Sequence, residues 1–142
     1  MCIRDRHCAL GMSQLGKLDK FISHRRLIAA AYDAALKPLS EHISPIPSAP
    51  KSRHAWHLYA VHLSEKISRS KLMRGLEENG IGTQVHYHPV HLQPFYGQHS
   101  IKLENANKYY STCLSLPIHM SMTKAKVQFI VGTIKNQLKT LL

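Results

Sequence analysis

Cysteine is scarce in this sequence, and no apolar run is long enough to cross a membrane. The three cysteines, Cys2, Cys8 and Cys113, are an odd number without a CxxC spacing, which argues against a disulfide framework and against a thiolate zinc site. No apolar run approaches the roughly 18 residues that a membrane-spanning helix requires, and the first residues lack the pattern of a secretory signal. We therefore expect a cytoplasmic protein with reduced cysteines.

Acidic residues are also few. Eight Asp and Glu residues stand against nineteen Lys and Arg, which gives a formal net charge of +11 with neutral histidines, so a polyanionic partner has to be considered. The positive charges are dispersed, however, with no basic block apart from Arg25-Arg26. The aromatic residues do not alternate with Lys and Arg as a nucleic-acid stacking surface requires. The sequence favours a solvated basic surface, or a site for a smaller phosphorylated ligand, over nucleic acid.

The first 39 of the 142 residues carry the longest periodic pattern. Residues 1–6 are polar and have no regular spacing of apolar side chains, whereas apolar residues recur at helical spacing from residue 7 to residue 39. This stripe consists of Met12, Leu15, Leu18, Ile22, Ala29, Tyr32 and Leu36. One helix over this range would approach 50 Å at about 1.5 Å per residue, more than a small domain needs for itself. We predict a bridge between two bodies.

The rest of the chain alternates strand and helix signals. Four prolines predict an extended connector over residues 38–50. The further expected elements, in chain order, are a central strand over 54–63, a helix capped by Ser68 and ended by Gly80, a strand over 81–88, a loop over 90–97, a helix over 105–116, and a last helix opened by Thr123. This order, without internal repeats, predicts an α+β fold with helices against a small sheet.

Three histidines cluster in "GTQVHYHPVHLQPFY", residues 82–96, and three interpretations compete for them. Zinc could be bound by His86, His88 and His91, but metal-bound imidazoles usually need a carboxylate partner, and the nearest acids in sequence are Glu78 and Glu104. Alternatively, the histidines are ordinary hydrogen-bonded residues of a strand. A polar ligand explains best why so many donor and acceptor groups gather at a strand end and a proline-braced loop.

Several segments resemble, in order and spacing, the C-terminal part of the DegT/DnrJ/EryC1/StrS family of pyridoxal-phosphate-dependent sugar aminotransferases. They are "HCALGMSQLGKLDKFISHRRLIAAAYDAAL", "AWHLYAVHL", "LEENGIGTQVHYHPVHLQPFY" and "YYSTCLSLPIHMSMT". The resemblance covers nearly everything after residue 6. Within the family, "GIGTQVHYHPVHLQPFY" is most similar to the members that aminate a 4-keto-6-deoxy sugar, linked to UDP, on the way to pseudaminic acid.

The resemblance implies a fold of the aspartate-aminotransferase type, PLP fold type I. In that fold a large domain holds the cofactor, and a small C-terminal domain closes over the substrate at a homodimer interface. Residues 7–39 would be the bridging helix and residues 40–142 the small domain. The implied reaction moves an amino group from glutamate to a nucleotide-linked keto sugar through a Schiff base between a lysine and pyridoxal 5'-phosphate.

The chain departs from the family pattern at the chemistry itself. The catalytic lysine, the acid that pairs with the pyridine nitrogen and the phosphate-binding residues belong to the large domain of the family, and none of the twelve lysines here lies in the matching motif. The family also has an Asn-Tyr-Arg segment where this chain reads "MCIRDR", so residues 1–6 are expected to be a start that is unrelated to the family or artefactual. By this interpretation the chain has no catalytic residue and, alone, neither binds the cofactor tightly nor transaminates.

The resemblance also implies a set of residues that line the substrate, which we call the substrate wall. It implies that Val85, His86, Tyr87, His88 and His91 line the nucleotide-sugar side of the active site, where imidazole and phenol groups hydrogen-bond sugar hydroxyls and phosphates. Gln93 and Tyr96 are secondary candidates for ligand contact, and core packing is expected for Trp56, Tyr59, Tyr109 and Tyr110. The alternative function is a free-standing basic module that binds a polyanion or a metal.

Overall fold

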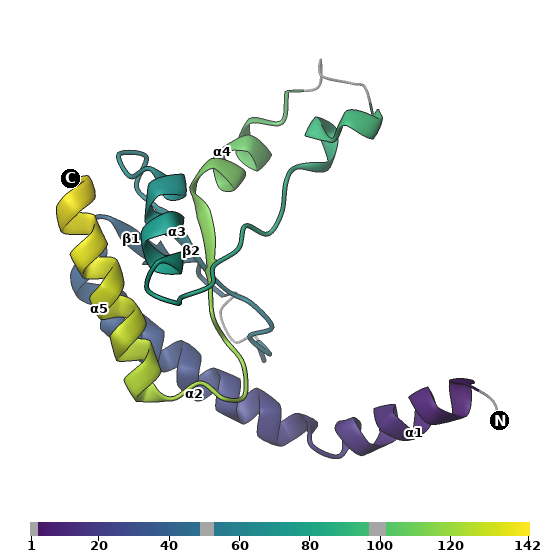
Figure 1. Ribbon diagram of the computed structural model, residues 1–142. Coiled ribbons are helices and arrows are strands. Elements are labelled where there is room, and N and C mark those ends of the chain that lie inside the picture. Colours follow the sequence, from purple (N-terminus) through teal and green to yellow (C-terminus); the bar gives the residue numbers. More distant parts are fainter. Residues whose placement is uncertain (1–2, 49–52, 97–101) are drawn as a thin grey trace.

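The computed structural model describes residues 3–48, 53–96 and 102–142, and it places helices against one face of a three-stranded antiparallel sheet (Figure 1). The strands are β1 (Ile43–Pro45), β2 (Tyr59–Leu63) and β3 (Cys113–Leu116), in the spatial order β1-β2-β3. The predicted α+β class, a small sheet covered by helices, agrees with this architecture. Cys2, Pro50 and Gly97, which entered the predictions from sequence, lie outside the described residues.

The central strand β2 organises the core. Its residues alternate between two environments, with Tyr59, Val61 and Leu63 buried and Ala60 and His62 half-buried, as the period of two in a strand requires. The prediction of a central strand is confirmed, but the predicted strand began at residue 54, earlier than β2 does. Residues 54–58 lie outside any strand, because Trp56 has a φ of 50° and this left-handed backbone cannot continue a strand.

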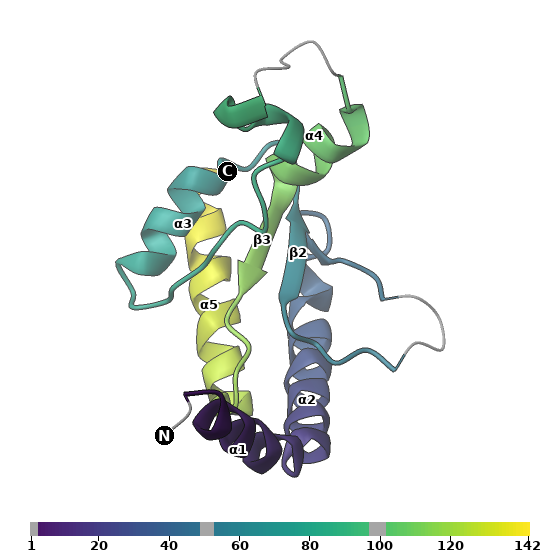
Figure 2. The same ribbon diagram turned by 90° about the vertical axis from the view of Figure 1, so that its right-hand side faces the viewer.

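Helices α2 (Leu18–Leu36) and α5 (Lys124–Leu141) run side by side behind the sheet (Figure 2). The Thr123 side chain accepts a hydrogen bond from the backbone N–H of Lys126 at the start of α5, as predicted for an N-cap. The α5 stripe is buried almost throughout, at Val127, Ile130, Val131, Ile134 and Leu138, with Leu141 partly buried against the same core. The predicted last helix is therefore confirmed.

The expected single helix over residues 7–39 is wrong. The structure has α1 (Ile3–Leu15), a turn at Gly16 and Lys17, α2, and a 3-10 turn, η1 (Lys37–Leu39), whose Pro38 cannot continue the hydrogen-bond ladder. Helix α1 extends away from the sheet (Figure 1), and none of its residues is buried. Met12 and Leu15, placed on the buried stripe by their spacing, are 76% and 68% exposed. Periodicity alone therefore predicted burial of apolar side chains on α1 that the structure does not show.

Three further predictions need correction. Residues 43–45, expected in an extended connector, form the edge strand β1, where the missing N–H of Pro45 is tolerated. Residues 81–88, expected as a strand, make a single bridge between Gln84 and Ser115. The helix expected over 105–116 ends early: α4 spans Glu104–Thr112 and is followed by β3, whose four buried residues pair with β2 on one side and meet Gln84 on the other.

Gly80 ends the third helix, α3 (Arg69–Glu77), in the left-handed conformation with a φ of 73°. The backbone N–H of Ile81 donates to the carbonyl of Leu76 at 2.9 Å, which closes the turn. A β-carbon at Gly80 would meet no atom within 4 Å. We expect Gly80→Ala to cost about 1 kcal/mol of unfolding free energy, from backbone conformation alone.

Gly82 provides the matched control for this substitution. A β-carbon there also meets no atom within 4 Å, and its φ is not in the left-handed region. Gly82→Ala should leave the urea midpoint unchanged or raise it slightly, because alanine restricts the unfolded chain. Equal midpoints for the two alanine variants would contradict a conformational role for Gly80.

Candidate functional site

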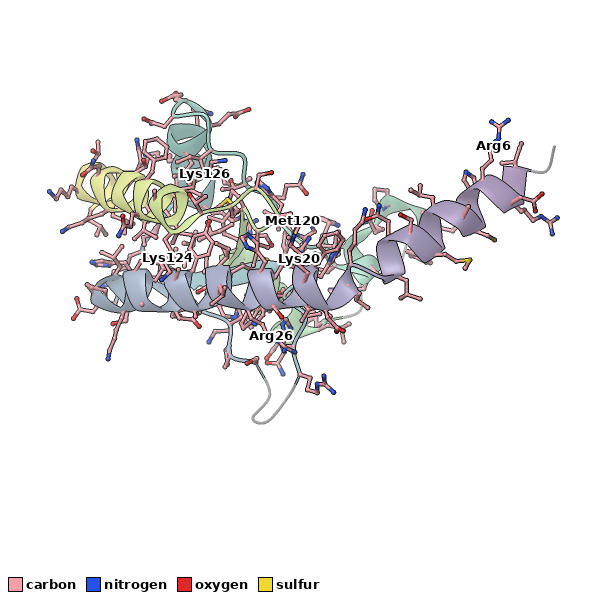
Figure 3. All side chains as sticks on the ribbon, turned by 90° about the horizontal axis from the view of Figure 1, so that it is seen from below. Arg6, Lys20, Arg26, Met120, Lys124 and Lys126 are labelled. Carbon is pink, nitrogen blue, oxygen red and sulfur yellow. The ribbon has the colours of Figure 1, made fainter. Side chains whose placement is uncertain are left out.

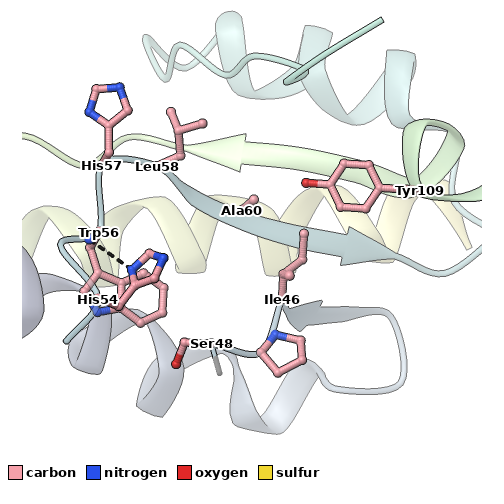
Figure 4. Close-up of a pocket in the computed structure, with 9 residues that line it drawn as sticks. Ile46, Ser48, His54, Trp56, His57, Leu58, Ala60 and Tyr109 are labelled. Atoms are coloured by element: carbon pink, nitrogen blue, oxygen red, sulfur yellow. Dashed lines mark hydrogen bonds between the residues drawn. The ribbon is translucent and has the colours of Figure 1, made fainter. Parts of the chain in front are cut away.

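The face of the sheet turned away from α2 and α5 carries Ala60, His62 and Ser115, and we call it the open face. Two cavities adjoin along it and share His57 and Leu58. The histidine cavity, of about 270 Å³, is lined among others by Gln84, His86 and Ser115. The aromatic cavity, of about 310 Å³, is lined among others by His54, Trp56, Ala60 and Tyr109 (Figure 4). Imidazole, phenol and indole groups are thus present in these concavities, beside aliphatic and small residues.

His86 is held in the histidine cavity by the sheet itself. The segment before it is tied to β3 by two backbone bonds, from the N–H of Ser115 to the carbonyl of Gln84 at 2.8 Å and from the N–H of Gln84 to the carbonyl of Ser115 at 3.3 Å. The His86 ring then lies with Nδ1 2.8 Å from the Oγ of buried Ser115. This bond fixes one ring nitrogen and leaves the other edge of the half-buried imidazole to meet a ligand.

The other two histidines of the cluster lie against α4 rather than beside His86. The His88 ring meets the Tyr110 ring edge-on, with centroids 5.2 Å apart. The Nε2 of His91 lies 3.0 Å from the Oδ1 of Asn107. Among the residues that the structure describes, no group of three or more His, Cys, Asp or Glu side chains is arranged to hold a metal ion. The geometry therefore gives no support to zinc binding by the three histidines.

The remaining candidates from the sequence lie outside the two cavities. Val85 is half-buried and Tyr87 is 71% exposed, and of the five residues expected to line the substrate only His86 lines either cavity of the open face. Gln93 precedes a short 3-10 turn, η3 (Pro94–Tyr96), and Tyr96 is its last residue; this turn lies with α4 beyond the end of the sheet (Figure 1).

Of the four aromatic residues expected in the core, only Tyr59 is fully buried. Trp56 packs partly against the core, and Tyr110 is half-buried under the guanidinium of Arg69, 4.8 Å from its ring centroid. Tyr109 is 39% exposed and contacts the edge of His62, so core packing was the wrong expectation for it. Partial burial raises the pKa of the Tyr109 phenol, which keeps it protonated and able to donate a hydrogen bond near neutral pH.

Sequence reasoning missed the part of the site contributed by residues 54–58. "HAWHL" was interpreted as the start of a strand, yet the structure turns it so that His54 and Trp56 face one cavity and His57 borders both. Arg25 holds this turn, because its Nη1 lies 3.0 Å from the carbonyl of Trp56 and 3.1 Å from that of His57. Three aromatic or imidazole rings within four residues were the signal that could have indicated a site.

In the part of the chain that the structure describes, positively charged side chains lie away from the two cavities. Figure 3 shows Arg6, Lys20, Arg26, Lys124 and Lys126 spread over α1, α2 and the start of α5. Among the described residues, no Lys, Arg, Asp or Glu lines either of the two cavities. No helix in the described part of the chain is both long and apolar enough to cross a membrane.

Comparison with known proteins gives a consistent result. Residues 1–135 match the DegT/DnrJ/EryC1/StrS aminotransferase family. The spore coat polysaccharide biosynthesis protein SpsC of Bacillus subtilis (strain 168) is 36% identical over 95% of this chain, which spans 36% of SpsC.

Two solved structures illustrate the shared fold. PseC of Helicobacter pylori, an aminotransferase involved in pseudaminic acid biosynthesis, is 28% identical with a TM-score of 0.86 over 93% of this chain and 36% of PseC. The putative sugar aminotransferase Spr1654 of Streptococcus pneumoniae in its PLP form is 24% identical with a TM-score of 0.82, over 94% of this chain and 35% of Spr1654. The chain thus spans about a third of the length of its relatives.

Proposed function

The chain belongs to the DegT/DnrJ/EryC1/StrS aminotransferase family, and from this premise we propose that it forms the substrate-side, C-terminal small domain of a nucleotide-sugar aminotransferase. The proposed reaction transfers an amino group from glutamate to the keto group of a UDP-linked 4-keto-6-deoxy sugar, within a homodimer. The observation that carries the proposal is the family match over residues 1–135. The pseudaminic acid pathway is supported by the similarity to PseC, with its TM-score of 0.86.

The residues of the open face do not fit the cofactor. Pyridoxal 5'-phosphate needs a lysine amine to condense with its aldehyde, and no lysine of the described segments lines the histidine cavity or the aromatic cavity. In the proposed enzyme the cofactor is therefore bound away from these two cavities, by the large domain that the family resemblance implies, with α1 and α2 as the connection to it. We expect the 142-residue chain by itself to show neither transamination nor tight cofactor binding.

The contribution of the chain in this proposal is to orient the sugar. His86 is braced by Ser115 and borders the histidine cavity, so its free edge can hydrogen-bond a sugar hydroxyl or a phosphate oxygen. A wrong substrate would leave this polar group unpaired, and such a loss costs about 1 to 3 kcal/mol. This side chain therefore selects the substrate by positioning it.

The test joins this chain to the upstream two-thirds of PseC and measures amination of a UDP-linked 4-keto sugar. We expect His86→Ala to lower kcat/KM about tenfold, the equivalent of about 1.4 kcal/mol of lost transition-state binding. The melting temperature should change little, since the His86 ring is only half-buried.

Two controls separate ligand contact from bracing. Asn107→Ala removes the partner of His91 and should leave kcat/KM within about twofold, because Asn107 lines neither cavity of the open face. Ser115→Ala leaves the imidazole in place but unbraced, so its effect should be smaller than that of His86→Ala. A sharp drop in melting temperature for His86→Ala, with unchanged kinetics, would show that His86 is structural.

A further inference from the structure

The aromatic cavity has a shape that neither the family match nor the histidine cluster explains. Figure 4 shows His54 and Trp56 together at one end, Tyr109 at the other, and Ala60 and Ile46 between them. The His54 and Trp56 rings lie edge to face, with centroids 4.4 Å apart at 61°. Ala60 is the only alanine among the described residues that line the cavity, and its short side chain leaves open the space that a larger residue would fill.

The chemistry of the lining selects a flat, uncharged ring. None of the nine described lining residues carries an ionised carboxylate, ammonium or guanidinium group. Aromatic side chains bind nucleobases by stacking, which works with any base because each has a π face. The hydroxyl of Tyr109 and the imidazoles of His54 and His57 supply hydrogen bonds to the polar edge of such a ring.

The backbone at Trp56 is held in an unfavourable conformation. Its φ of 50° is uncommon for a bulky residue, and three contacts maintain it. The backbone N–H of Trp56 donates to the Nδ1 of His54 at 3.0 Å, its carbonyl accepts from Arg25, and Arg26 Nε donates to the carbonyl of His54 at 3.1 Å. Such strain persists where the surroundings impose it and is concentrated at binding sites.

The two cavities share His57 and Leu58 in their linings, so they are neighbours. We propose that the aromatic cavity binds the nucleobase of the nucleotide sugar, with the diphosphate passing His57 and the sugar lying beside His86. This inference rests on the proposed function and adds to it the part of the chain that recognises the nucleotide.

The experiment uses the fluorescence of Trp56, the only tryptophan of the chain. UDP and inorganic pyrophosphate are titrated against the 142-residue chain. UDP should quench Trp56 saturably, whereas pyrophosphate, which has no base, should not. Ala60→Leu fills the cavity from the open face without touching the buried side of β2, and it should weaken UDP binding tenfold or more. Ala60→Ser keeps the cavity open and should bind UDP as the unmodified chain does.

The outcomes distinguish this inference from the proposed function. Saturable quenching by UDP that Ala60→Leu abolishes supports the aromatic cavity. Equal UDP affinity in Ala60→Leu and Ala60→Ser, equal responses to UDP and pyrophosphate, or no saturation overturns it. If UDP-N-acetylglucosamine shifts the His86 ring signals in NMR spectra while Trp56 fluorescence stays unchanged, the nucleobase assignment fails and the proposed substrate wall stands. Activity of the PseC fusion tests the proposed function independently of all these results.

Discussion

Replacing Arg25 with alanine is expected to lower the free energy of unfolding by about 3 kcal/mol. Hydrogen bonds from charged donors contribute about 1.5 to 3 kcal/mol each, and here all of them come from one nitrogen of the guanidinium group. The Nη1 of Arg25 lies 3.0 Å from the carbonyl of Trp56, 3.1 Å from that of His57 and 3.0 Å from that of Ile118. The N–H groups of this nitrogen thus connect α2 to the turn before β2 and to the segment after β3. Urea denaturation followed by Trp56 fluorescence measures the loss.

Arg26 is the matched control, because it is the neighbouring arginine and also bonds this turn. It is exposed and donates through Nε to one carbonyl, that of His54 at 3.1 Å. Arg26→Ala should therefore cost less than about 1 kcal/mol. Arg25→Lys should recover part of the stability but not the native emission of Trp56, since an ammonium lacks the planar geometry of a guanidinium. Equal losses for the two alanine variants would refute the role assigned to Arg25.

The elements that the sequence predicted well are those whose signals are local. The apolar stripe of α5 and its Thr123 cap lie within about 20 residues of one another, and Gly80 shows its left-handed role by its place after the helix. The alternation of side chains between the two faces of β2 could also be predicted from the sequence, from Tyr59 onward. Local patterns are sufficient where the periodicity itself determines which side chains meet the core.

The errors have non-local causes. Residues 113–116 continue an α-helical pattern, but β2 offers an open edge and Gln84 closes the other side, so strand pairing wins. Helix α1 has apolar residues at helical spacing, and yet none of its residues is buried in the described part of the chain. Neither the partner of a strand nor the absence of a partner for a helix is encoded in a segment of about ten residues.

The candidate site also has one part that the sequence predicted and one part that it did not. His86 stood out because histidines were concentrated around it, and the structure does place it in a cavity. His54 and Trp56 were assigned to a strand, because the conformation that turns them toward the aromatic cavity is imposed by Arg25, 31 residues from Trp56. A site that depends on such a distant clamp cannot be predicted from periodicity, although the density of rings in "HAWH" was visible.

Raising the pH above 10 is expected to unfold the protein steeply, because of two buried phenols. Tyr32 and Tyr59 stack with ring centroids 4.7 Å apart, and neither has any exposed surface. Burial raises the pKa of both, and the hydrogen bond of Tyr59 to Asp33, at 2.6 Å, raises the pKa of Tyr59 further. The folded state therefore retains two protons that the unfolded chain releases near pH 10.

The sign of the effect follows from proton linkage. Below pH 10 both states hold these protons, and the stabilisation is complete. Above pH 10 the unfolded state binds fewer protons than the folded state, so the free energy of unfolding falls by about 1.4 kcal/mol per pH unit for each phenol, or about 2.7 for the pair. Two pH units then remove about 5 kcal/mol, which is the whole stability of many small domains.

The measurement follows helix content by circular dichroism and tyrosinate by ultraviolet absorbance in one pH titration. The last tyrosinate signal should arise together with unfolding. Tyr32→Phe keeps the ring stack but loses the 2.9 Å bond to the carbonyl of Pro117, so it starts less stable. Its stability should nevertheless fall less steeply with pH. Phenylalanine cannot ionise, so unfolding of this variant above pH 10 releases one proton fewer. An unchanged slope in this variant, or gradual ionisation of all tyrosines with the helices intact, would contradict the assignment of these two phenols to the alkaline transition.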